Sequence, residues 1–104
     1  MGNEAFAATA VVATDKASGY LRQLCRHFGH KAAAQFDATD GSIAFPFGSC
    51  TISALPAGRL TLRVAASTAE DLERVKDVVG GHLERFAFRE GLRVEWTPAA
   101  DGGD

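Results

Sequence analysis

Apolar residues recur every three or four positions between residues 16 and 28, and this spacing places them on one face of an α-helix. Thr14 and Asp15 stand before this run as suitable N-cap residues, and Gly29 follows it where a left-handed C-terminal residue is common. We therefore predict a helix over residues 16–28 whose apolar stripe faces the core. The stripe consists of Ala17, Leu21, Leu24 and Phe28, with Tyr20 at its edge.

A second helical pattern follows Ser67. Ser67 and Glu70 have the spacing of a capping box, with Ser67 as the N-cap. Gly80 and Gly81 fall in the middle of this helix, where each glycine costs about 1 kcal/mol relative to alanine. They indicate a kink or the close approach of a loop, or else a helix break whose N–H groups hold an anion beside His82. The predicted buried face consists of Leu72, Val75, Val79, Leu83 and Phe86.

Alternation of apolar and polar residues, the pattern of a half-buried strand, marks the remaining elements. These predicted strands cover residues 6–13, 32–37, 43–54, 60–65 and 92–96. Thr39, Asp40 and Gly41 form a turn between the second and third strands, and residues 55–58 form a turn between the third and fourth. Within residues 43–54 the alternation changes phase near Pro46 and Gly48, so we predict a bulge or a sharp bend there.

The predicted order of elements is β-α-β-β-β-α-β. Hairpin strands between two helices indicate an α+β fold, a two-layer sandwich with both helices on one face of a mainly antiparallel sheet, related to the ferredoxin-like arrangement. We expect a flexible N-terminus over residues 1–5, a single domain over residues 6–96 and a disordered tail over residues 97–104.

Composition limits the function classes. The chain has 104 residues, a formal net charge of −2 and 46% hydrophobic residues, as expected of one soluble domain. Interspersed charges argue against a nucleic-acid partner, although Lys16, Arg22, Arg26 and Lys31 form a local basic cluster. Neither a signal peptide nor a membrane-spanning segment is evident, so we expect a cytoplasmic protein without a membrane partner. We also expect it to be a monomer or a weak dimer.

The two cysteines do not form a metal-binding motif. Cys25 and Cys50 are predicted to be buried free thiols, because two unpatterned cysteines do not make a disulfide framework. Cys25 and His27 fall on opposite flanks of the apolar stripe, roughly 160° apart, so one ion cannot be held by both while the helix is intact.

The histidines are the better candidates for a site. His82 projects toward the apolar face of the second helix, where a ring nitrogen should bond a backbone carbonyl or Glu84. If the helices pack side by side, His27, His30 and His82 converge at their seam and are suited to iron or zinc. The three histidines and Glu84 are therefore candidate ligand-binding residues, and the histidines alone are candidate metal ligands.

Three separated blocks of the sequence resemble a known bacterial family, described only as domain of unknown function 2218. The blocks are YLRQLCRHFGHK (residues 20–31), GSIAFPFGSC (41–50) and HLERFAFRE (82–90). The resemblance implies kinship with domains joined to siderophore-interacting flavin reductases, and hence a role near iron acquisition with a ferric chelate or such a reductase as partner. Some members of the family carry the label 2,4-dihydroxyhept-2-ene-1,7-dioic acid aldolase.

Three function classes stay open. The aldolase label conflicts with the chain length, because metal-dependent aldolases of that name are (β/α)8 barrels of about 250 residues. A Schiff-base route would need a buried lysine, whereas Lys16, Lys31 and Lys76 fall at helix ends or on polar faces. We favour a non-enzymatic binding or accessory domain over a metal-dependent lyase and over a structural protein-interaction module. The sequence indicates no particular cofactor.

Overall fold

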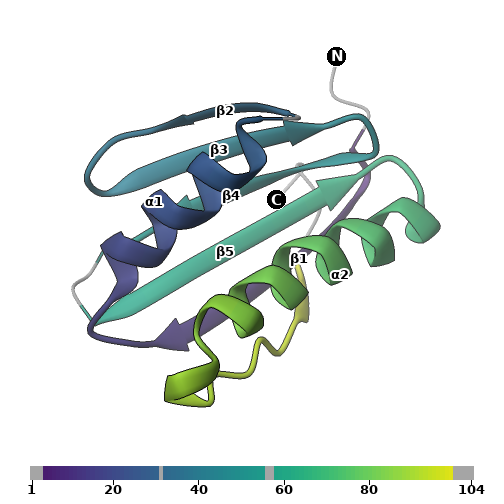
Figure 1. Ribbon diagram of the computed structural model, residues 1–104. Coiled ribbons are helices and arrows are strands. Elements are labelled where there is room, and N and C mark those ends of the chain that lie inside the picture. Colours follow the sequence, from purple (N-terminus) through teal and green to yellow (C-terminus); the bar gives the residue numbers. More distant parts are fainter. Residues whose placement is uncertain (1–3, 31, 56–57, 100–104) are drawn as a thin grey trace.

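The computed structural model describes residues 4–30, 32–55 and 58–99 of the chain. Two α-helices, α1 and α2, and a short 3-10 helix, η1, alternate with the strands of one sheet (Figure 1). The elements are β1 (Phe6–Ala13), α1 (Ala17–Phe28), β2 (Ala33–Phe36), β3 (Asp40–Phe45), β4 (Gly48–Ser53), β5 (Arg59–Ala66), α2 (Ala69–Phe86), η1 (Phe88–Glu90) and β6 (Thr97–Ala99).

The strands form one six-stranded sheet in the order β2-β3-β4-β5-β1-β6. Neighbouring strands pair antiparallel throughout, with Cys50 opposite Val64 and Leu62 opposite Ala10 in the centre. Both helices lie on the same face of this sheet (Figure 1). The α+β two-layer fold predicted from the sequence is therefore confirmed.

The core lies between the sheet and the helices. Alternate residues of the central strands point toward the helices, and the apolar stripes of both helices cover them. Full burial of a leucine or valine side chain contributes roughly 2 kcal/mol, so these contacts dominate the stability. The largest fully buried residues include Leu21 and Leu24 of α1, Val75, Val79 and Leu83 of α2, and Ile43, Ile52, Leu60, Leu62 and Val64 of the sheet.

Where the sequence predicts a bulge or a sharp bend within residues 43–54, the chain instead reverses direction in a tight turn. Phe45 pairs with Gly48 across the turn at Pro46 and Phe47, so β3 and β4 are two strands of a hairpin. The prediction of one bent strand was wrong, and the sheet has one strand more than expected. Ile43 and Cys50 still face the same core, because they are paired across the hairpin and directly paired residues point to the same face of a sheet.

The last predicted strand is also misplaced. Residues 92–96 form no strand, although Leu92, Val94 and Trp96 pack partly buried against the core. The strand at this end is β6, which pairs with β1 through Thr97 opposite Thr9. The predicted disordered tail is therefore wrong for residues 97–99, whereas residues 100–104, residues 1–3 and residues 56 and 57 of the predicted turn lie outside the described residues.

Both helices begin one residue later than predicted. Lys16 is the N-cap of α1, and the Thr14 hydroxyl accepts a hydrogen bond from the Lys16 N–H at 3.1 Å. Thr68 is the N-cap of α2 and accepts a hydrogen bond from the Asp71 N–H, so the capping box from Ser67 does not form. At the end of α1, Gly29 keeps right-handed helical dihedrals, contrary to the left-handed conformation predicted.

Helix α2 continues without a break through Gly80 and Gly81. A Cβ atom on Gly80 would lie 3.2 Å from Nε1 of Trp96 and 3.5 Å from Cγ1 of Val94. Of the alternatives raised by the sequence, the close approach of another segment is the one found, and the helix break with free N–H groups is not. Gly80 lets the chain that follows η1 pass directly over α2.

Replacing Gly81 with alanine should raise the free energy of unfolding by about 1 kcal/mol, because the helix gains propensity and the new methyl meets no described atom within 4 Å. The same change at Gly80 should lose this gain, since its methyl presses on the Trp96 ring. Urea denaturation of the two variants beside the wild type measures both effects. Equal stabilisation by both would show that Trp96 does not pack on α2.

Candidate ligand-binding site on helix α1

The side chains of His27 and His82 meet where the two helices come into contact. His27 lies exposed on α1 and His82 is half-buried on α2. The centroids of their rings are 4.7 Å apart, with the ring planes inclined by 41°. The structure thus brings these two candidate residues together at the helix seam.

His82 is held by its own helix. Its Nδ1 lies 2.7 Å from the carbonyl oxygen of Val78, and since a carbonyl only accepts, Nδ1 carries the proton and donates it. Glu84 lies elsewhere on the helix and accepts a hydrogen bond from the Val94 N–H at 2.8 Å. Of the two hydrogen-bond partners predicted for His82, the backbone carbonyl is the one found. Glu84 instead holds the segment that crosses α2.

The three histidines are only partly assembled. His30, just beyond the end of α1, lines a surface hollow with His27, whereas the ring contacts of His82 are with His27, Phe28 and Phe86. In the described part of the chain, no three His, Cys, Asp or Glu side chains are grouped to hold a metal ion. A three-histidine metal site would need these side chains to move together, and it stays a prediction.

Phenylalanine rings extend from the histidine pair to the β3–β4 turn. Phe28 lies 4.9 Å from His82 and 5.1 Å from Phe45, measured between ring centroids. Phe45 stacks on Phe47, whose ring is covered by the Arg74 guanidinium at 4.3 Å. These rings fill the space between the end of α1, the turn and α2.

A shallow hollow of about 400 Å³ lies on the outward face of α1, at the low end of the size range of ligand sites. Most of its lining comes from α1, and α2 contributes one aromatic ring. His27 belongs to both this hollow and the histidine pair. The lining residues are Gly19, Arg22, Gln23, Arg26, His27, His30 and Phe86.

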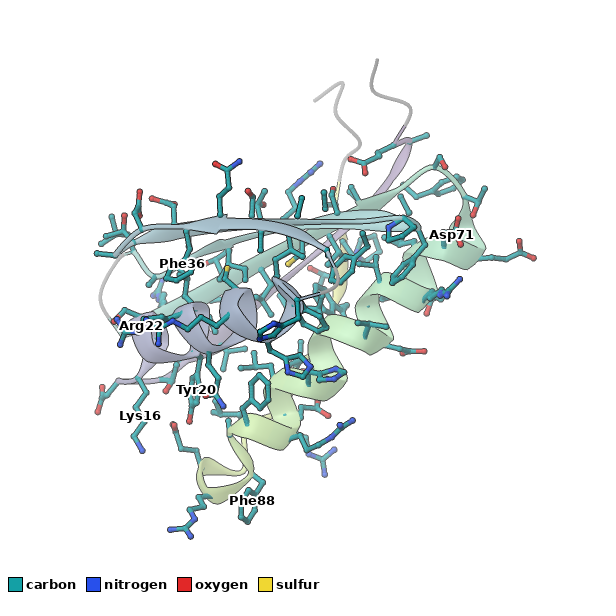
Figure 2. All side chains as sticks on the ribbon, turned by 45° about the horizontal axis from the view of Figure 1, so that its top comes forward. Lys16, Tyr20, Arg22, Phe36, Asp71 and Phe88 are labelled. Carbon is teal, nitrogen blue, oxygen red and sulfur yellow. The ribbon has the colours of Figure 1, made fainter. Side chains whose placement is uncertain are left out.

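The permanently charged side chains that line the hollow, Arg22 and Arg26, are of one sign. Helix α1 contains no aspartate or glutamate, and Arg22 and Arg26 stand one helical turn apart on its exposed surface. Figure 2 shows Lys16 extending away from the start of α1, and Arg22 lies further along the same helix. The Arg26 guanidinium also lies 6.0 Å from the centre of the Phe36 ring. A chain of net charge −2 therefore presents a locally cationic surface with an aromatic rim.

A polar cluster at the start of α1 was not anticipated from the sequence. Tyr20 donates a hydrogen bond to one carboxylate oxygen of Glu90, and Thr14 donates to the other at 2.9 Å. Burial, followed by the Glu90 contact, raises the pKa of Tyr20 to about 12, and the hydrogen bond from Tyr20 lowers the pKa of Glu90. The position of Tyr20 at the edge of the apolar stripe could have indicated a buried hydroxyl in need of a partner. The cluster fastens η1 to the start of α1.

Raising the pH beyond 10 should destabilise the wild type more steeply than a Tyr20→Phe variant. The pKa of Tyr20 rises from 10.0 in the unfolded chain to about 12 in the folded protein. The contribution of this proton to stability is therefore complete below pH 10 and is lost as the pH climbs toward 12. Denaturant midpoints of the wild type and of Tyr20→Phe, each measured at neutral pH and at a pH between these two pKa values, give the loss of stability in each protein. Parallel losses in both proteins would contradict the buried phenol.

The cysteines offer no reactive thiolate. Cys25 and Cys50 are both buried and free, as predicted. Burial, with a smaller effect of Cys25, raises the pKa of Cys50 to about 12, and burial also raises the pKa of Cys25. The thiolate form needed for nucleophilic attack is therefore disfavoured at both positions.

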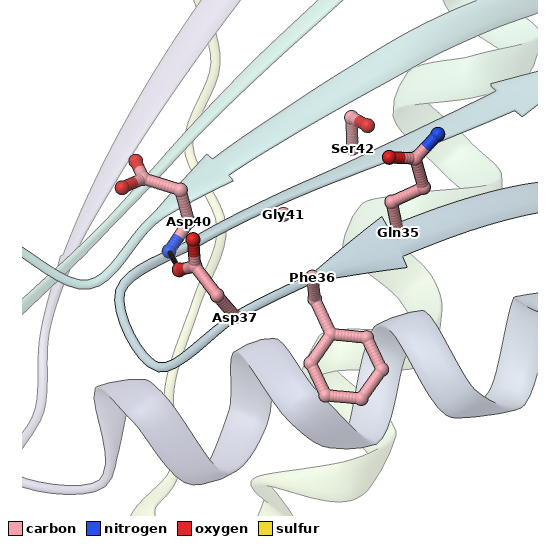
Figure 3. Close-up of a pocket in the computed structure, with 6 residues that line it drawn as sticks. All are labelled: Gln35, Phe36, Asp37, Asp40, Gly41 and Ser42. Atoms are coloured by element: carbon pink, nitrogen blue, oxygen red, sulfur yellow. Dashed lines mark hydrogen bonds between the residues drawn. The ribbon is translucent and has the colours of Figure 1, made fainter.

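Another hollow, of about 320 Å³, lies at the β2–β3 turn (Figure 3). Asp37 accepts hydrogen bonds there from the N–H groups of Thr39 and Asp40, which lower its pKa, and Asp40 accepts one from the Thr39 hydroxyl. Phe36 points toward α1 in this view. These carboxylates hold the hairpin turn together, so the hollow is a less suitable ligand site than the one on α1.

Comparison with known proteins places the chain in a family. A model of an uncharacterised protein family conserved in bacteria, domain of unknown function 2218, matches residues 9–97. A structure of PA4090 from Pseudomonas aeruginosa, determined by NMR, superposes with a TM-score of 0.76 at 31% sequence identity, covering 92% of this chain and 99% of that one. No curated protein gives a significant match.

One finding bears on the membrane. Among the described residues, neither helix combines the length and the apolar character that crossing a bilayer demands. The fold agrees with that of PA4090, and the family match runs from the middle of β1 to the first residue of β6. The chain therefore belongs to the bacterial family described as domain of unknown function 2218.

Proposed function

We propose that this domain is a binding module that takes a small anionic compound with a flat apolar ring on the outward face of α1. The observation that carries the proposal is the hollow in which Arg22, Arg26 and the Phe86 ring line one surface. Guanidinium groups pair with carboxylate, phosphate or phenolate oxygens, and an aromatic wall accepts a flat ring. The hollow therefore offers both kinds of contact to one ligand.

The charge distribution supports an anion over a cation. Arg22 and Arg26 are one turn apart, and the imidazole rings of His27 and His30 line the hollow beside them. No carboxylate lines the hollow among the described residues. A negatively charged compound is attracted to such a surface even though the chain as a whole is slightly acidic.

Ferric catecholates are the ligand class that we propose first. They join flat rings to oxygen atoms that carry net negative charge, and they match the siderophore association implied by the family resemblance. The module binds such a chelate without transforming it. In support of this, Lys16 is exposed, Lys76 is paired with Glu73 at 2.8 Å, and both thiols are buried, so none of these groups is prepared as a nucleophile.

Titration calorimetry tests the proposal with three probes: dihydroxybenzoate, its ferric complex and uncharged catechol. We expect saturable binding of the two anions, weaker as salt is added, and no binding of the neutral ring. Binding of catechol as tight as that of the anions would remove the role of the arginines. Absence of binding by both anions at low salt would refute the proposed function.

A further inference from the structure

Most of the described glycines occupy positions where the fold leaves no room for a side chain or where φ is positive. A Cβ atom would lie 2.8 Å from the Cys25 thiol at Gly41, 2.7 Å from the Ala65 carbonyl oxygen at Gly48, and 3.2 Å from Trp96 at Gly80. Glycines with positive φ among the described residues are Gly58 and Gly91. Each of these positions has a reason within the chain to lack a side chain.

Gly19 has no such reason. It is the third residue of α1, it lacks a positive φ, and no described atom lies within 4 Å of the place where its Cβ would stand. Alanine there would favour the helix. Gly81 in α2 shares these properties, but Gly19 alone of the two lines the cationic hollow.

We infer that Gly19 is a specificity-determining residue of the hollow, where the flat ring of the ligand lies directly against the backbone of α1. Arg22 and Gln23 follow it by three and four residues, so they are its neighbours on the helix surface and flank the gap that the missing side chain leaves. A side chain at position 19 would fill this gap. Small anions without a ring would still reach the arginines beside it.

This inference rests on the proposed function, and its test separates the two. Gly19→Leu and the matched Gly81→Leu variant are titrated with dihydroxybenzoate and with inorganic phosphate, beside the wild type. We expect both variants to melt at or above the wild-type temperature. Gly19→Leu should bind dihydroxybenzoate at least 10-fold more weakly and phosphate unchanged, whereas Gly81→Leu should bind both as the wild type does.

The outcomes are distinct. Wild-type affinity of Gly19→Leu for dihydroxybenzoate would overturn the role of Gly19 and leave the proposed function standing. Absence of dihydroxybenzoate binding by the wild type would overturn both. An equal loss for Gly81→Leu would also overturn the assignment to Gly19. If Gly19→Leu melts below the wild type, Gly19→Ala takes its place with the same expected direction, because a methyl group there meets no described atom within 4 Å.

Discussion

Replacing Gly48 with alanine should lower the free energy of unfolding by about 3 kcal/mol. The added Cβ would stand 2.7 Å from the carbonyl oxygen of Ala65, 3.4 Å from Cβ of Ala66 and 3.5 Å from Cβ of Val75. The first of these is a backbone atom in the central strand β5, which cannot turn aside as a flexible side chain can. Relief of the clash therefore requires the β3–β4 hairpin to move away from β5 and α2.

Urea denaturation followed by circular dichroism measures this loss. Gly81→Ala is the matched control, because it makes the same chemical change where no described atom lies within 4 Å, and it should be stabilising. A Gly48→Ala variant as stable as the wild type would mean that the hairpin does not pack on β5 as described. The register of Ser49 opposite Ala65 would then need revision.

Removing the charge of both Arg22 and Arg26, as Arg22→Gln with Arg26→Gln, should weaken binding of dihydroxybenzoate about 30-fold. Exposed charge pairs contribute up to about 1 kcal/mol each, and two of them together account for a change of this size. The stability of the domain should be nearly unchanged, since both side chains are exposed. The effect should shrink as salt screens the charges of the wild type.

The matched control removes two exposed arginines elsewhere, Arg59→Gln with Arg93→Gln, and so lowers the net charge equally. Arg59 begins β5 and Arg93 lies in the segment after η1. If the long-range field of the protein were responsible, both double variants would lose affinity alike. Titration calorimetry of the two at low and high salt decides between local contacts and net charge.

Local periodicity predicted the elements whose apolar pattern repeats over several helical turns. The stripe from Ala17 to Phe28 predicted α1 because each member lies on one helical face, and all its members are buried. The β3–β4 turn was missed because the change of phase near Pro46 is explained equally well by a bulge or bend in one strand and by a hairpin. Pro46 and Phe47 also lack the Asn-Gly pattern that marks a two-residue turn.

Contacts between distant segments could not be read from the sequence. The segment over residues 92–96 has the alternation of a strand, with Leu92, Val94 and Trp96 packed against the core. A β-strand also needs a hydrogen-bonded neighbouring strand, and local alternation does not show whether one is present. The pairing of Tyr20 with Glu90 joins residues 70 positions apart, which no local pattern encodes.

For the candidate site, the helical projection placed His27 on a flank of α1 and His82 on the inner face of α2, and their ring contact followed from the packing of the helices. The hollow was not predicted. It depends on Phe86 reaching α1 from the other helix and on the missing side chain of Gly19, both of which are three-dimensional facts.

The most direct test of the central claim is an NMR titration of the nitrogen-15-labelled domain with dihydroxybenzoate. We expect saturable shifts of the amides of Gly19, Gln23 and His27, while Thr51 and Thr61, on the open face of the sheet, stay unchanged. This result would locate the ligand on the outward face of α1. Saturable shifts confined to the open sheet, or no shifts at all, would contradict the account.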